Sequence, residues 1–421
     1  MLDIKFIREN KDLIALAAKK KGIKFEVQEL LTADTKRREL MQSIEAKKAE
    51  QNSFNEKIAT AATPELRAEM IAKMKIVKDE AGKQDELFKE VMKTWQNLML
   101  QVPNIPDISV PDGDSDADNK ETKTWGEISK FDFKPKDHIE LMTNLDMLDI
   151  ERGVKVAGFR GYFLKNEGVA LQFALWNFVR DYFADKGFTQ MLVPSMVKRE
   201  AFMGTGYIPQ SEEDLYKTQD GEYLSGTAEV ATMSYHMDEV IDKKKLPMKF
   251  LSFSPCFRRE IGAHGKDTRG ILRVHEFYKW EQVVLCEASH AESVKFHEEI
   301  TALSEGLMQA LELPYHVVAN CGGDLGLGQV KKYDIEAWLP SENKYRETGS
   351  ASYFHDFQTR RLNIRYKDDD GKMKFAHSLN NTALSGRPLI MIVENYQQAD
   401  GSIKIPKVLQ KYFGKDIIKK S

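Results

Sequence analysis

Residues 257–281 read FRREIGAHGKDTRGILRVHEFYKWE. Cationic side chains crowd this stretch, although the whole chain has a formal net charge of only −3. They are Arg258, Arg259, Lys266, Arg269 and Arg273. The pattern predicts a strand that ends near Arg258, a loop over IGAHGKDTRG, and a second strand that begins near Ile271. Two interpretations remain open at this point, a solvated hairpin tip or a clamp for polyphosphate.

Residue alternation in the second strand puts Phe277, Lys279 and Glu281 on one face. An arginine at a strand end, such as Arg258, suits a fixed phosphate because its planar fork binds oxyanions in a bidentate manner. Phe277 offers a flat surface for a purine on the same hairpin. The loop cations Lys266, Arg269 and Arg273 suit either longer-reaching phosphate contacts or plain solvation.

Composition favours a soluble, cytoplasmic protein. The 421 residues are 42% hydrophobic and 30% charged, and no long apolar run interrupts them. The cysteines Cys256, Cys286 and Cys321 are odd in number and far apart, so neither a disulfide framework nor a zinc site is predicted.

An apolar repeat of alternating threes and fours extends over residues 28–102 and predicts two long helices. Thr63 before Pro64 has the pattern of a helix N-cap followed by proline at the first helical position. The economical interpretation is an antiparallel helical hairpin, and the alternative is a self-associating coiled coil. Polar residues on the seam, namely Arg37, Lys47, Gln51 and Gln84, predict a thin, flexible hairpin.

The expected organisation is an N-terminal helical domain over residues 1–104, a linker rich in Pro, Asp and Gly over 105–130, and a catalytic domain over 131–421. In the last segment, helical patterns alternate with strand-like runs joined by short turns. We therefore predict an α+β fold with an antiparallel sheet core flanked by helices.

Other phosphate-binding motifs match poorly. Asp267 follows Gly265-Lys266 where a P-loop needs Ser or Thr, and Glu260 stands where it needs glycine. The glycine-rich run GGDLGLG at residues 322–328 does not have the strand-to-helix setting of a dinucleotide fingerprint.

The opening stretch resembles motif 2 of class II aminoacyl-tRNA synthetases, and the match to the seryl-tRNA synthetase family is closer still. That family's other motifs are similar to GTGYIPQSEEDLY, GTAEV, KKYDIEAWLP, YRETGSAS and SLNNTALSGRPLIMIVENYQQADGSI, in this order. The resemblance covers the whole chain, including the helical hairpin.

The resemblance implies roles for individual residues. It implies catalytic roles for Arg258, Arg387 and Glu347. It implies a serine pocket formed by Thr227, Ala228, Glu229, Arg258, Glu281 and Thr382. It implies an ATP site formed by Arg258, Arg259, Glu260, Val274, Phe277, Glu347, Thr348, Gly349, Ser350 and Arg387. Mg²⁺ would lie on Glu347 and Ser350.

The family resemblance also implies substrates and partners: ATP, L-serine and tRNA(Ser), with tRNA(Sec) left open. It implies a homodimer whose motif 1 proline, here Pro194, lies at the interface. The hairpin, with 20 Lys and Arg against 17 Asp and Glu in residues 1–100, would reach the long variable arm of tRNA.

Two departures from the family pattern affect these expectations. Ser225-Gly226 replaces an apolar residue and proline before Thr227. The segment between Thr382 and Arg387 is one residue shorter than usual, which bears on both assignments. Two alternative functions also remain: a paralogue that loads an amino acid onto a carrier protein, and a catalytically silent tRNA-binding scaffold.

Overall fold

The computed structural model describes residues 1–262, 265 and 267–420. The chain divides into two compact units. The smaller unit comprises Leu2–Lys19 and Ile23–Pro103, and the larger one comprises Met1, Lys20–Gly22 and Asn104–Ser421.

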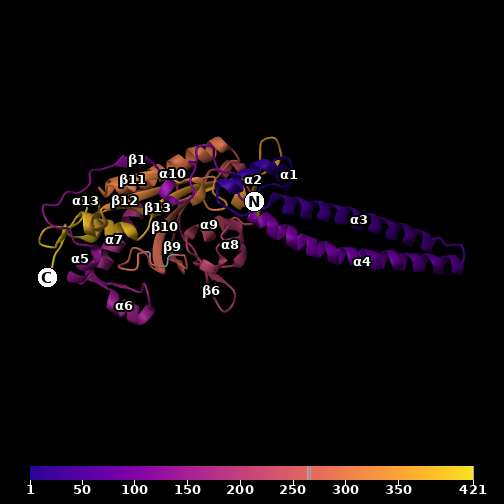
Figure 1. Ribbon diagram of the computed structural model, residues 1–421, viewed down its shortest axis with the longest axis horizontal. Coiled ribbons are helices and arrows are strands. Elements are labelled where there is room, and N and C mark those ends of the chain that lie inside the picture. Colours follow the sequence, from indigo (N-terminus) through magenta and orange to yellow (C-terminus); the bar gives the residue numbers. More distant parts are fainter. Residues whose placement is uncertain (263–264, 266, 421) are drawn as a thin grey trace. The chain divides into compact units, whose positions relative to one another are not determined.

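The smaller unit is helical. Its elements are α1 (Ile4–Glu9), most of α2 (Lys11–Lys20), α3 (Val27–Ala59) and α4 (Pro64–Gln101). The helices α3 and α4, together called the arm below, lie side by side as a hairpin (Figure 1). As predicted, Thr63 caps α4, because its hydroxyl accepts a hydrogen bond from the Leu66 amide at 3.3 Å and Pro64 takes the first helical position.

Cross-helix pairs show that the arm is antiparallel. Ser43 on α3 donates to Gln84 on α4 at 3.0 Å, whereas Lys47, further along α3, reaches back to Glu80 at 2.5 Å. Of the polar residues predicted to weaken the seam, Gln84 and Lys47 thus each have a partner on the opposite helix.

The larger unit is built on an eight-stranded sheet in the order β1-β11-β12-β13-β16-β10-β9-β4. Their bounds are β1 (Lys120–Trp125), β4 (Thr189–Leu192), β9 (Met248–Phe257), β10 (Glu276–Cys286), β11 (Tyr315–Ala319), β12 (Lys331–Leu339), β13 (Lys344–His355) and β16 (His377–Leu384). Every pairing is antiparallel except that of β4 with β9. This confirms the predicted fold class. Part of the predicted linker forms the edge strand β1.

Alternation gives β9 and β10 two different faces. Leu251, Trp280 and Val284 belong to the main apolar core, which also contains side chains of α7 (Asn166–Tyr182) and α10 (His290–Ala310). The opposite face carries Ser252, Lys279 and Glu281, beside α9 (Ala228–Ser234), whose Thr232 donates to Ser252 at 2.8 Å. The apolar face therefore packs in the core and stabilises the sheet, whereas the opposite face presents polar side chains that can bind a ligand.

Shorter elements surround the sheet. The helices are α5 (His138–Asn144), α6 (Ile150–Ala157), α8 (Arg199–Thr205), α11 (Phe357–Arg361), α12 (Arg387–Asn395) and α13 (Lys407–Phe413). Small sheets are formed by β2 (Leu148–Asp149) with β3 (Phe163–Leu164), by β5 (Met196–Val197), β6 (Tyr216–Lys217) and β7 (Tyr223–Leu224), by β8 (Val240–Ile241), β14 (Arg365–Lys367) and β15 (Met373–Phe375), and by β17 (Ile403–Lys404) with β18 (Ile417–Ile418).

All three cysteines are free and buried. Among the helices in the described part of the chain, none combines the length and apolar content that a membrane span requires.

Candidate active site

The hairpin of β9 and β10 positions Arg258. The Arg258 amide donates to the His275 carbonyl at 2.9 Å across the hairpin. Its guanidinium carbon lies 5.3 Å from the centre of the Phe277 ring. Arg258 and Phe277 thus lie together on the hairpin that the sequence predicted.

The second strand begins at Glu276, later than the predicted Ile271. Leu272 and Val274, whose apolar side chains suggested a strand, are instead buried by packing outside the ladder, with 5% and 7% exposure. The loop between the strands is longer for this reason.

The segment before α9 approaches the Arg258 side chain closely. Arg258 Nε donates to the Gly226 carbonyl at 3.2 Å, and a Cβ at residue 226 would lie 3.2 Å from Arg258 Cγ. Ser225 Oγ donates to the Thr227 carbonyl at 2.5 Å. These contacts fix the turn where the family has proline.

Arg387 and Glu347 meet beside this hairpin. Arg387, the first residue of α12, donates from Nε to the Leu272 carbonyl at 3.2 Å and from Nη1 to the Glu347 carbonyl at 2.5 Å. Nη1 also lies 3.2 Å from Glu347 Oε2. The Glu347 side chain is 46% exposed, and the surrounding residues remove part of its solvation, which acts to raise its pKa. The positive charges of Arg387, Lys332 and Arg258 outweigh this effect and hold the pKa below its usual value. Glu347 is therefore ionised and shared among cations.

Glu281 and Thr382 are directly opposite each other on β10 and β16. The Thr382 hydroxyl lies 3.5 Å from Glu281 Oε2, and Asn380 Nδ2 lies 3.3 Å from Oε1. The buried ammonium of Lys279 is ion-paired with Glu281 and donates to Thr227 Oγ1 at 3.0 Å and to Thr382 Oγ1 at 3.3 Å. The short segment before Arg387 thus leaves Thr382 beside Glu281.

A second buried carboxylate, Glu229, lies in the first turn of α9. It accepts hydrogen bonds from Gln358 at 2.7 Å and from the Tyr207 hydroxyl at 3.2 Å. Burial raises the pKa of Glu229 to about 7, and the negative charge of Glu281 acts in the same direction. Two buried carboxylates with different partners therefore lie close enough to influence each other.

The remaining predicted residues lie around these groups. Ala228 is buried at the start of α9, and Val274 is buried in the hairpin loop. Thr348 is buried on β13 and donates to the Ile335 carbonyl at 3.0 Å. Gly349 faces Thr382: a Cβ at residue 349 would lie 2.9 Å from Thr382 Cβ, so the close approach of β13 to β16 requires glycine.

Loop residues of the hairpin are held by ion pairs. Arg273 pairs with Glu260 at 2.6 Å and with Asp267 at 3.3 Å, and Asp267 also pairs with Arg346. Arg259 is exposed and donates to the Glu213 carbonyl at 2.8 Å. Lys266, for which the sequence left open phosphate contact or plain solvation, lies outside the described residues.

The structure adds residues that sequence reasoning did not assign to the site, chiefly Lys279, Tyr207, Gln358 and Asn380. Lys279 had a visible signal, since alternation placed it between Phe277 and Glu281. Tyr207 and Asn380 lie in the quoted motifs GTGYIPQSEEDLY and SLNNTALSGRPLIMIVENYQQADGSI, but the motifs alone assigned neither a role. Gln358 had no signal, because its partner Glu229 comes from a distant segment of the chain.

The glycine-rich run at 322–328 binds the protein's own lysine. Lys21 is buried, and its ammonium donates to the carbonyls of Gly326, Leu327 and Gln329 at 3.0, 2.9 and 2.6 Å. Burial lowers the pKa of Lys21 well below its usual value. The run is structural and has no strand-to-helix phosphate loop.

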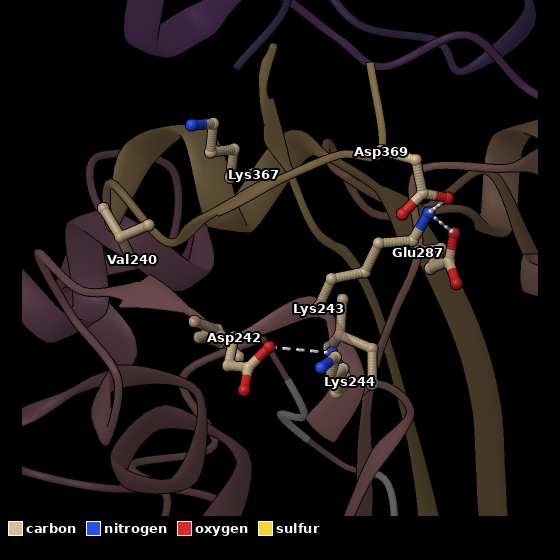
Figure 2. Close-up of a pocket in the computed structure, with 9 residues that line it drawn as sticks. Val240, Asp242, Lys243, Lys244, Glu287, Lys367 and Asp369 are labelled. Carbon is tan, nitrogen blue, oxygen red and sulfur yellow. Dashed lines mark hydrogen bonds and ion pairs between the residues drawn. The ribbon is translucent and has the colours of Figure 1, made fainter. Parts of the chain in front are cut away.

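A separate pocket lies beyond the start of β9, at the end of that strand opposite Arg258 (Figure 2). Its lining residues are Val240, Ile241, Asp242, Lys243, Lys244, Leu246, Glu287, Lys367 and Asp369. Lys243 extends across it to Glu287 and Asp369 at 3.3 and 2.5 Å (Figure 2). Three lysines and three acidic residues line this pocket, so their charges cancel and the pocket does not favour an anionic or a cationic ligand.

Comparison with known proteins agrees with the geometry. The model of the tRNA synthetase class II core domain (G, H, P, S and T) matches residues 215–396, and that of the seryl-tRNA synthetase N-terminal domain matches residues 1–106. The serine–tRNA ligase of Deinococcus radiodurans is 43% identical over 416 residues, covering 98% of each chain. That of Thermodesulfovibrio yellowstonii is 42% identical over 426 residues, covering 100% of each chain.

Two solved structures are similar over the full length. The seryl-tRNA synthetase of Pyrococcus horikoshii complexed with ATP has a TM-score of 0.92 and 39% identity, with 100% of each chain covered. The cytoplasmic serine–tRNA ligase of Naegleria fowleri in complex with AMP has a TM-score of 0.88 and 30% identity, with 100% of this chain and 99% of that one covered.

Proposed function

Because this chain belongs to the seryl-tRNA synthetase family, we propose that it activates L-serine with ATP and transfers the seryl group to the 3′ end of tRNA(Ser). The observation that carries the proposal is that Arg258 is held beside the turn before Thr227, while Thr227, Glu281 and Thr382 all contact Lys279. Neither a carrier-loading paralogue nor a silent scaffold accounts for this set together with the full-length similarity.

The serine pocket has the chemistry that a small hydroxylated amino acid requires. Glu281 would accept a hydrogen bond from the substrate hydroxyl, and Thr382 would form a second hydrogen bond with the same hydroxyl. A site built to hydrogen-bond a hydroxyl rejects the analogue that lacks it by about 10⁴–10⁵-fold. Alanine would therefore be excluded by the unpaired groups that it leaves behind. Ala228, at the start of α9, would add a wall of the pocket.

The adenylation step needs positioning and charge stabilisation more than a protein nucleophile. The serine carboxylate attacks the α-phosphorus of ATP, and both reactants are anions. Arg258 would bind the α-phosphate, Phe277 would stack on adenine, and Arg387 would face the γ-phosphate. Pyrophosphate leaves with the electrons of the broken phosphoanhydride bond.

The other ATP contacts would come from the surrounding loops and strands. They are Arg259, Glu260, Val274, Thr348 and Gly349.

Mg²⁺ fits the residues on β13. Within the described ranges, no three His, Cys, Asp or Glu side chains form a metal-binding group. Mg²⁺ commonly takes one or two carboxylates together with substrate phosphates, so Glu347, with 46% exposure, and Ser350 suffice to hold it. When bound, the ion would neutralise phosphate charge.

The arm and the surface suggest further partners. A basic excess over residues 1–100 supports tRNA binding by the arm.

Several apolar side chains of the larger unit are exposed to solvent. Val156, Phe173 and Leu192 are 74%, 61% and 82% exposed, and Pro194 is exposed nearby in sequence. We propose that these apolar side chains are covered in a homodimer, because large apolar side chains left in solvent are favourable to bury at an interface. A cytoplasmic location suits this activity.

The proposal is tested by amino-acid-dependent ATP–pyrophosphate exchange, with serine, threonine and alanine compared and Arg258→Ala as control. Serine-specific exchange is expected, with a loss of at least about 10²-fold in the control. Charging of tRNA(Ser) then separates a tRNA ligase from a carrier-loading enzyme, and tRNA(Sec) is assayed beside it. No exchange with any amino acid in folded protein supplied with Mg²⁺ would leave the scaffold as the better explanation.

A further inference from the structure

The most unusual group in the pocket is Lys279. Its side chain is 7% exposed and its ammonium lies between three oxygen atoms: Thr227 Oγ1 at 3.0 Å, Thr382 Oγ1 at 3.3 Å, and the Glu281 carboxylate with which it is ion-paired. An ammonium has three N–H donors, and these three acceptors use all of them. Lys279 therefore has no donor left for a substrate and acts on its neighbours.

These contacts determine what the neighbours can offer. Because Thr227 accepts from Lys279 and from the Glu229 amide at 3.3 Å, its own O–H is left to donate. The Thr382 hydroxyl also accepts from Lys279, and its O–H makes only a long contact of 3.5 Å with Glu281, which a substrate hydroxyl can replace. Glu281 receives the positive charge and is neutralised as a pair. The Glu281 oxygens keep acceptor capacity, since the contact to Asn380 at 3.3 Å is long.

Glu229 has a different position in the same pocket. The donors that reach it, Gln358 and Tyr207, are neutral. Of the two buried carboxylates, Glu229 is thus the one whose charge is still without a close cationic partner among the described contacts. A substrate ammonium would supply that partner.

We propose that Lys279 is a specificity-determining positioning residue that dedicates Glu281, Thr227 and Thr382 to the substrate hydroxyl and leaves Glu229 to receive the substrate ammonium. This inference rests on the proposed function and deepens it. It divides the pocket into a hydroxyl side, neutralised by the protein, and an ammonium side, neutralised only when the amino acid binds.

A purely structural role for Lys279 would have other consequences. A buried ion pair that only holds β10 in place would, when broken, lower stability and harm ATP and serine kinetics alike. A positioning role predicts a selective effect on the amino acid. The measurements that separate the two are the KM for serine against the KM for ATP, and the ratio of kcat/KM for serine to that for alanine.

The test is pyrophosphate exchange by the full-length protein with Lys279→Met, an unbranched side chain one atom shorter that has neither donors nor charge. We expect the KM for serine to rise by about 10–100-fold, the KM for ATP to change by less than about twofold, and the serine-to-alanine ratio to fall by at least about 10-fold. Lys279→Gln keeps two N–H donors, so it should retain more of the ratio than Lys279→Met. If Lys279→Met does not fold, Lys279→Gln takes its place in the same measurements.

Lys249→Met is the matched control. Lys249 is also a mostly buried lysine in the same sheet, paired with Glu299 at 2.6 Å, but it lies at the start of β9. It should leave the serine-to-alanine ratio unchanged.

Two results would overturn the inference: an unchanged ratio in folded Lys279→Met, or parallel losses for ATP and serine with a lower melting temperature. An inactive wild-type protein would instead contradict the proposed function itself.

Discussion

The arm and the site on β10 both contain lysine–glutamate ion pairs. The two environments differ in exposure, so the pairs contribute differently to the stability of the protein. On the arm, Lys47 meets Glu80 at 2.5 Å with side chains 19% and 55% exposed. In the pocket, Lys279 meets Glu281 with side chains 7% and 2% exposed. Exposed pairs are screened by water and contribute little, whereas a buried charge without its partner is costly. The degree of burial, more than the residue types, therefore decides how much each ion pair contributes to stability.

The largest effect is expected from breaking the buried pair. Glu281→Ala leaves the Lys279 ammonium with hydroxyl partners only, so we expect a loss of about 3–5 kcal/mol in the free energy of unfolding. Serine-dependent exchange should disappear as well. Denaturant unfolding followed by the exchange assay measures both.

A double variant sharpens this result. Lys279→Met with Glu281→Leu removes both charges, and most of the stability should return because apolar side chains replace a buried ion pair well. Activity should not return, because the hydroxyl-binding groups are gone. Equal stability of Glu281→Ala and wild type would show that the pocket pair resembles the arm pair after all.

The next effect concerns pH and the second carboxylate. The pKa of Glu229 is about 7 in the free protein, so below that pH the group is protonated and cannot pair with the substrate ammonium. We expect kcat/KM for serine to fall about 30-fold from its plateau at alkaline pH to pH 5.5. The groups facing Glu229 or its partners are Lys279, Glu281, Tyr207 and Arg258. Burial raises the pKa of Tyr207 well above its usual value, so this hydroxyl does not titrate between pH 5.5 and 7.

Two controls accompany the pH profile. The KM for ATP, measured over the same range, should not follow the same curve. Glu229→Gln should be slow at every pH and should lack this acid limb. A flat serine profile in the wild-type protein would contradict the assignment of Glu229 to the ammonium.

A buried charge also exists in the helical unit, and it tests whether burial alone governs the effect. Asp34 on α3 is 1% exposed and pairs with Arg8 at 3.3 Å and Arg37 at 2.8 Å. Because both arginines are partly exposed, Asp34→Asn should cost only about 1–2 kcal/mol. Hydrogen exchange of α3 amides measures this loss locally. Pyrophosphate exchange should be unaffected, and reduced exchange activity would show that Asp34 matters beyond local stability.

Local patterns predicted most of the secondary structure. The helices of the arm follow from a repeat that neighbouring residues carry by themselves, and Thr63-Pro64 marks the start of α4. The start of β10 was misplaced because Leu272 and Val274 are apolar for packing reasons. Periodicity does not distinguish a buried loop residue from a strand residue.

The site was predictable to a different extent. Motif order identified Arg258, Glu281 and Thr382, and the structure brings the last two together on adjacent strands. The contacts of Lys279 with Thr227 and Thr382 were not predictable, since these residues are 52 and 103 positions away in the chain. Register between strands, which sets such contacts, depends on the whole sheet.

The smallest effect is expected at the exposed pair of the arm. Lys47→Ala should leave the melting temperature and the exchange of α3 amides unchanged within error, because solvent screens the pair with Glu80. Lys47→Leu should increase protection of these amides, since Lys47 lies at a seam position where an apolar side chain would pack against α4. A marked loss of protection in Lys47→Ala would mean that the polar seam holds the two helices in register, and that exposure alone does not determine the weight of an ion pair in this protein.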